Sequence, residues 1–123
     1  MTEEQIYKAR TIFQHYGLDN QLRILQEECA ELIQAVSKYQ RAQDAGKPIL
    51  QAKTALMEEV ADVSIMITQI VTMFSGRALS AIVDNKLDRQ LARISKEGLG
   101  TPRGLVHWKR ASSPVEAGTS GFL

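Results

Sequence analysis

A chain of 123 residues is long enough for one domain with a modest core and too short for two ordinary ones. Hydrophobic residues make up 44% of it and charged residues 24%, which is typical of a folded globular protein and excludes disorder throughout. The formal net charge is +1, with no broad basic surface, so binding to nucleic acid or to an anionic membrane is disfavoured.

Single sequence features argue against three further classes of protein, namely secreted proteins, membrane-spanning proteins, and proteins held by disulfides or thiolate zinc clusters. The chain opens with MTEE instead of a basic segment followed by an apolar run, so we expect no secretory signal. No stretch approaches the roughly 18 apolar residues of a membrane span, and the expected location is cytoplasmic. Cys29 is the only cysteine, which excludes an internal disulfide and a thiolate zinc cluster and is typical of a buried, inert thiol.

The first predicted helix opens at Thr2, which has the pattern of a capping box with Gln5, and stops at Gly17. Asp19 is predicted to cap a second helix. In that helix apolar residues recur at steps of three and four, the helical period, until the breaker at 46–48. These residues are Leu22, Leu25, Cys29, Leu32, Ile33 and Val36.

Two more helices follow Pro48. The third is predicted to end near Gly76, and the fourth to run from about Leu79 to Lys96. The apolar stripe of the third is Leu56, Val60, Val63, Ile67, Ile70, Val71 and Phe74. Since no segment alternates between apolar and polar residues, no sheet is expected. The predicted fold class is all-α: a four-helix bundle over residues 1–98, followed by a flexible tail at 99–123.

Two short acidic stretches lie in the second and third helices. Each places two carboxylates three residues apart, Glu28 with Glu31 and Glu59 with Asp62, and on a helix this spacing puts both on one face beside the apolar stripe. The 27 residues between the pairs are enough for two packed helices to bring them together. Four carboxylates beside a core would repel one another strongly unless protons or cations neutralise them.

The pattern therefore predicts a bound divalent cation. Mg²⁺, or Mn²⁺ in its place, fits because every ligand is an oxygen and no histidine stands three or four residues from the acids. A di-iron oxidase centre is disfavoured because it needs Glu-x-x-His pairs. The open alternative is that each pair is only the solvated face of an amphipathic helix.

The fourth predicted helix carries a basic edge. Lys86, Arg89 and Arg93 recur at steps of three and four, so they could grip a phosphate chain beside a metal ion, or form a solvated basic face. Phosphate oxygens readily complete the coordination of a cation held by carboxylates on its other side, which indicates nucleotide chemistry. His15 is a candidate to contact a base, with a place in the core as its alternative.

The arrangement Glu27-Glu28-x-x-Glu31, a gap, then Glu59-x-x-Asp62 resembles the signature of the MazG-like, all-α nucleoside triphosphate pyrophosphohydrolases. The likeness covers most of residues 10–95. It implies a helical bundle, dimeric or tetrameric, that hydrolyses a nucleoside triphosphate to the monophosphate and pyrophosphate. By this resemblance the Mg²⁺ ligands are Glu28, Glu31, Glu59 and Asp62, and the residues that contact the nucleotide are Asn85, Lys86, Arg89 and, less directly, Arg93.

The competing interpretation belongs to another class of protein. The chain would be a non-enzymatic helical module that interacts with or regulates a partner, and its acids would simply be solvated. Magnesium binding distinguishes the two interpretations.

Overall fold

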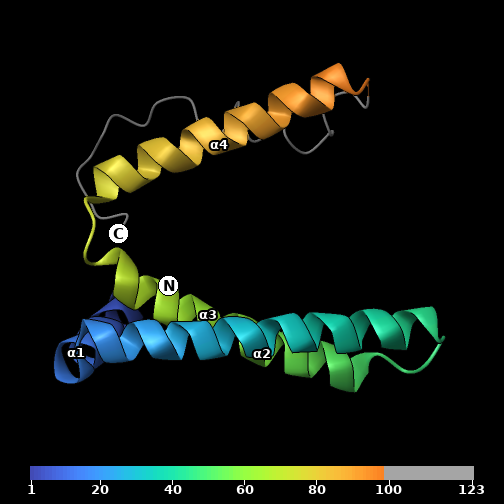
Figure 1. The fold of residues 1–123 in the computed structure, drawn as a ribbon, viewed down its shortest axis with the longest axis horizontal. Coiled ribbons are helices and arrows are strands. Elements are labelled where there is room, and N and C mark those ends of the chain that lie inside the picture. Colours follow the sequence, from blue (N-terminus) through green and yellow to red (C-terminus); the bar gives the residue numbers. More distant parts are fainter. Residues whose placement is uncertain (99–123) are drawn as a thin grey trace. The chain divides into compact units, whose positions relative to one another are not determined.

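The computed structural model describes residues 1–98, and the predicted tail at 99–123 lies outside the described residues. The described part holds four helices, α1 (Glu3–Tyr16), α2 (Leu18–Asp44), α3 (Leu50–Val71) and α4 (Gly76–Lys96), and no strand (Figure 1). The prediction of an all-α fold with four helices is therefore confirmed. None of these helices is long and apolar enough to cross a membrane.

The chain divides into two compact units. The first, Met1–Met73, contains α1, α2 and α3, and the second begins at Phe74 and contains α4. In the first unit α3 packs along α2 and also contacts α1. The candidate site lies in this first unit.

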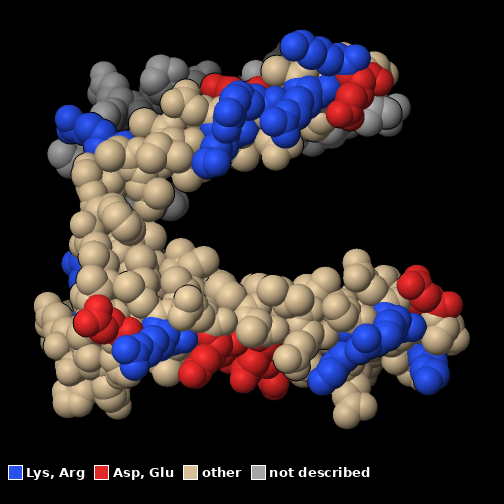
Figure 2. Space-filling view, viewed as in Figure 1, with Lys and Arg blue, Asp and Glu red and all other residues tan. Residues whose placement is uncertain are grey.

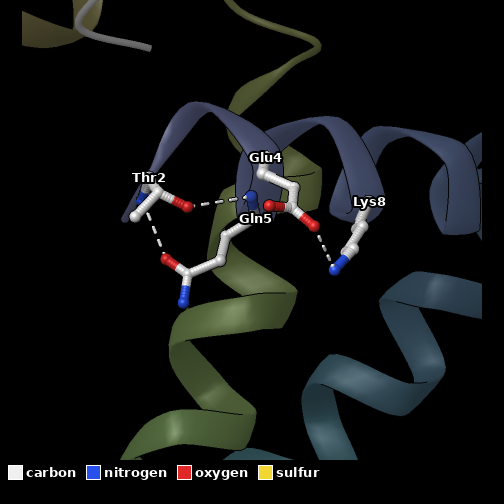
Figure 3. Close-up of polar contacts among 4 residues, drawn as sticks. All are labelled: Thr2, Glu4, Gln5 and Lys8. Carbon is white, nitrogen blue, oxygen red and sulfur yellow. Dashed lines mark hydrogen bonds and ion pairs between the residues drawn. The ribbon is translucent and has the colours of Figure 1, made fainter.

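The predicted capping box at the start of α1 is confirmed (Figure 3). The Thr2 hydroxyl accepts the Gln5 backbone N–H at 3.1 Å, and the Gln5 side-chain oxygen accepts the Thr2 N–H at 2.8 Å. One turn on, Glu4 and Lys8 form an exposed ion pair at 2.7 Å, which contributes about 0.3–0.5 kcal/mol. The reciprocal cap satisfies two backbone donors that a helix start otherwise leaves unpaired.

Gly17 alone joins α1 to α2. Its φ of 81° and ψ of 166° form a combination that is open essentially only to glycine. Its N–H donates to the Phe13 carbonyl at 2.9 Å and ends α1, and its carbonyl accepts the Gln21 N–H at 3.1 Å and opens α2. The prediction that Asp19 caps α2 is therefore wrong. Asp19 lies inside the first turn of α2, where its negative charge interacts favourably with the positive end of the helix dipole.

The boundary between α3 and α4 differs from the prediction. Helix α3 ends at Val71, where the hydroxyl of Thr72 donates to the Gln69 carbonyl at 2.6 Å, so the predicted end near Gly76 is wrong. Helix α4 then begins at Gly76, because Ser75 accepts the Ala78 backbone N–H at 3.3 Å and caps it. The glycine was interpreted as a stop signal, whereas the serine before it is a start signal.

Helices α2 and α3 form an antiparallel hairpin whose contact follows a heptad pattern. Buried and half-buried residues repeat at alternating steps of four and three, as in a coiled coil. We call these positions the α2–α3 seam. On α2 they are Gln21, Leu25, Glu28, Leu32, Ala35, Tyr39 and Ala42, and on α3 they are Ala52, Leu56, Glu59, Val63, Met66 and Ile70.

The seam departs from the predicted apolar stripes. Ile33 is 67% exposed on α2, and Val60 and Ile67 are about half exposed on α3. Both helices carry apolar side chains over more of their circumference than one neighbouring helix can cover. The spacing of the apolar residues alone therefore does not determine which of these side chains face the other helix. As a result, Glu28 and Glu59 lie in the seam itself, whereas the prediction placed them on its flank.

A buried amide pair crosses the seam. Gln21 donates from Nε2 to Oε1 of Gln69 at 2.7 Å, with 4% and 1% of the two residues exposed. Gln69 Nε2 also approaches the sulfur of Met66 at 3.8 Å. Because both amides are shielded from water, the bond fixes which residues of α2 face which residues of α3.

Gln69→Leu is expected to lower the free energy of unfolding by about 1–3 kcal/mol, because it leaves the buried amide of Gln21 without its acceptor. Replacing both glutamines with leucine is expected to recover most of this loss, since no buried polar group then lacks a partner. Urea unfolding followed by circular dichroism measures both effects. A single variant as stable as the wild type would show that the bond contributes nothing.

Candidate metal centre

The register of the hairpin brings the two acidic pairs together. Seven residues after Gln21 comes Glu28, and seven residues before Gln69 comes Asp62, so these two acids face each other across the seam. Three residues further along, Glu31 faces Glu59 in the same way. All four acids therefore belong to two adjacent layers of one helix pair.

Three of the four acids converge closely. Glu28, Glu59 and Asp62 each offer a carboxylate oxygen, and these oxygens all lie within 4.8 Å of one another. Two oxygens bound to one Mg²⁺ lie no more than about 4 Å apart, so small rotations of the side chains would close the set around an ion. The donor set consists only of oxygens, which suits a hard divalent cation.

Burial of Glu59 gives the centre a second distinctive feature. Glu59 is half-buried, and its Oε2 is shielded from solvent without a hydrogen-bond partner among residues 1–98. Shielding a carboxylate oxygen from water without a partner is unfavourable. A proton or a bound cation at this oxygen would remove the cost.

The pKa of Glu28 is raised above its ordinary value of 4.5. Burial is the largest cause, followed by the negative charges of Asp62, Glu31 and Glu59, and then of its neighbour Glu27. Removing water from the carboxylate and surrounding it with like charges both disfavour its ionised form. The order of these charges agrees with the register, in which Asp62 faces Glu28.

The pKa of Glu59 is raised for the same reasons. Burial again comes first, followed by the charges of Glu31 and Asp62 and then of Glu58. Glu31 is thus part of the same electrostatic cluster, although it lies outside the closest set of three oxygens. It is exposed, and with Glu59 it lines one end of a neighbouring groove.

Among the residues that the structure describes, no basic side chain forms an ion pair with these acids. The single ion pair formed within residues 1–98 joins Glu4 to Lys8 in α1. Figure 2 shows acidic side chains gathered near the middle of the hairpin, with Lys and Arg toward its loop. Within residues 1–98 the cluster therefore has no cationic side chain paired with it, and its oxygens are a donor set that a divalent cation could use.

Comparison with protein-family models, curated proteins and solved structures finds no match for this chain. The MazG-like resemblance therefore depends on the residues themselves.

The remaining predicted site residues lie elsewhere in the chain. His15 is exposed near the end of α1, where its ring meets that of Tyr16 edge to face at 4.7 Å. The four predicted nucleotide contacts all lie on α4, in the second unit, and all are exposed. They are Asn85, Lys86, Arg89 and Arg93. The centre described above is thus built by α2 and α3.

Two lysines beside the centre were not among the predicted site residues. Lys38 and Lys47 line the groove whose other end is formed by Glu31 and Glu59. A signal for Lys38 is present in the sequence, because it follows Glu31 by seven residues and so lies on the same face of α2 two turns later. Lys47 lies in the loop after α2, where no periodicity could have indicated its position.

Proposed function

We propose that this chain is a Mg²⁺-dependent nucleoside triphosphate pyrophosphohydrolase of the MazG-like type, acting in the cytoplasm. The observation that carries the proposal is the convergence of Glu28, Glu59 and Asp62 within 4.8 Å at the seam of two helices. Glutamates that served only as solvated surface would have no reason to occupy the seam positions of Glu28 and Glu59, where an apolar residue would be more stable.

The proposed reaction adds water at the α-phosphorus and breaks its bond to the oxygen that bridges the α- and β-phosphates. The products are a nucleoside monophosphate and pyrophosphate. A divalent cation in the centre would neutralise the phosphates and stabilise the departing pyrophosphate. Glu28, Glu59 and Asp62 would hold it, and Glu31 would complete the ligand set. Mn²⁺ is expected to replace Mg²⁺ because it accepts the same oxygen ligands.

The basic edge of α4 is proposed to contact the nucleotide. Lys86, Arg89 and Arg93 follow one another at steps of three and four residues, so their charges lie on one face of the helix. Guanidinium and ammonium groups form the charge-assisted hydrogen bonds that phosphate oxygens accept best. Asn85 would add a neutral hydrogen-bonding group beside them, and His15 is proposed to contact the base.

The first unit supports an assembly of two or four copies. Ile33, Leu50 and Met57 are each 66–76% exposed, and such apolar side chains are unfavourable in water. A homodimer or homotetramer would bury them. The same apolar surface favours the second candidate function, a non-enzymatic helical module that binds a partner protein.

The deciding experiment is a panel of the common ribo- and deoxyribonucleoside triphosphates assayed for pyrophosphate release with the full chain. We expect release with at least one substrate in the presence of Mg²⁺ and none after chelation. Orthophosphate in place of pyrophosphate would mean that a different bond is broken. No hydrolysis of any substrate, together with no heat of Mg²⁺ binding in calorimetry, would favour the interaction module.

A further inference from the structure

Between the acidic layers and the loop, several residues at the seam have small side chains. Ala35 and Ala42 occupy it on α2, and Ala52 occupies it on α3, with Ala55 beside it. Because alanine does not fill the space between two helices, an open groove of about 680 Å³ remains there. This volume falls in the range of small-molecule sites.

The rim of the groove is polar and basic. Lys38 and Gln34 border it from α2, Gln51 borders it from α3, and Lys47 borders it from the connecting loop. Neither lysine has a carboxylate partner within residues 1–98. A second hollow of about 650 Å³ continues past both lysines and adds Arg41, with Asp44 as its one acid. The loop end of the hairpin thus holds ammonium groups free to bind an anion.

The groove connects these lysines to the metal centre. Glu31 and Glu59 form its other end. Lys38 follows Glu31 by seven residues, so the helical rise separates their backbones by about 10 Å along α2. A ligand that starts at a cation held by the acids would therefore meet Lys38 first as it follows the groove, and Lys47 lines the groove further along, in the loop.

We propose that the groove binds the pyrophosphate end of the triphosphate, with Lys38 and Lys47 as its binding residues. This inference rests on the proposed function, since it assigns a direction to the substrate at the same centre. The β- and γ-phosphates extend from the metal toward the loop, and the nucleoside points away from the groove.

The composition of the rim decides between the two ends of the substrate. A base is held by aromatic side chains on which it stacks, and none lines the groove. Phosphates are held by ammonium and amide donors, which are the polar groups of the rim beyond the two glutamates at its metal end. The pyrophosphate is also the part of the substrate with the highest charge, and it matches the unpaired lysines.

Calorimetric titration of the full chain with inorganic pyrophosphate in the presence of Mg²⁺ tests the proposal. Lys38→Ala and Lys47→Ala are each expected to weaken binding about tenfold, the usual loss for one charge-assisted contact. Lys53→Ala removes the same charge from an exposed position on α3 outside the groove and is expected to leave binding unchanged. A nucleoside monophosphate is expected to bind all four proteins equally well.

A change of shape without a change of charge gives an independent test. Ala52→Leu places a larger side chain in the groove and is expected to weaken pyrophosphate binding by a similar factor, with the helical signal in circular dichroism checking the fold. Absence of pyrophosphate binding, equal affinity in both lysine variants and the wild type, or an equal loss in Lys53→Ala would each overturn the proposal.

The titration also separates the groove from the activity. If the chain cleaves triphosphates while the lysine variants bind pyrophosphate normally, the groove proposal fails and the proposed function stands. If no triphosphate is cleaved but pyrophosphate binds through Lys38 and Lys47, the proposed function fails and the assignment of the groove as a pyrophosphate site stands.

Discussion

Asp62→Asn is expected to lower the rate of Mg²⁺-dependent pyrophosphate release by more than about a hundredfold. The substitution keeps the shape of the side chain but removes a charged oxygen from the closest set of three. Changes to groups that only support a metal ligand already cost about 10–100-fold, so loss of a ligand is expected to cost more. Turnover measured at saturating Mg²⁺, beside the calorimetric affinity for the ion, separates weak metal binding from lost chemistry.

Glu58→Gln is the matched control for this experiment. Glu58 is an exposed acid on α3 next to Glu59 and lies outside the set of three oxygens, so the variant changes the net charge by the same amount. Its rate is expected to stay within a few-fold of the wild type. If both variants lose activity equally, the effect comes from the general charge of the hairpin, and the assigned centre is wrong.

Without metal, the protein is expected to become more stable as the pH falls from neutrality toward the ordinary glutamate value of 4.5. The pKa values of Glu28 and Glu59 are raised in the folded state, so between the ordinary and raised values the folded chain binds more protons than the unfolded chain. Stability must then rise as the pH falls through the raised values and level off below the ordinary one. Urea unfolding in the presence of a chelator measures the slope.

Two additions sharpen this prediction. Glu59→Gln is expected to stabilise the metal-free protein at neutral pH, because it removes one charge from the cluster, and to flatten the pH dependence. Mg²⁺ at about a hundred times its dissociation constant is expected to add about 2.7 kcal/mol of stability to the wild type and much less to this variant. A metal-free protein whose stability falls steadily on acidification would contradict the assignment of both glutamates.

Much of the fold follows from local patterns in the sequence. Thr2 with Gln5, and the glycine at 17, mark the two ends of α1 because caps and positive φ angles depend on nearby residues alone. The approach of the two acidic pairs to each other was also predicted from the sequence, because acids three residues apart on two successive helices can meet once those helices pack together.

The burial of the acidic side chains could not be predicted in the same way. Ile33 and Val60 are as apolar as the residues in the seam, and only contact with a second helix determines which face turns inward. Glu28 and Glu59 were therefore expected on the flank of the apolar stripe, whereas they lie half-buried in the seam. The groove has the same origin, since alanines leave a hollow only where two particular helices face each other.

The amide bond between Gln21 and Gln69 determines more than local packing. In a heptad pattern, two helices can slide past each other by seven residues and still match apolar positions. Such a shift would place Glu28 opposite Ala55 and dismantle the acidic layers, while most of the apolar contacts would survive. A single buried hydrogen bond thus sets the register of the hairpin. Correct assembly of the charged centre depends on this neutral contact, which lies two helical turns away.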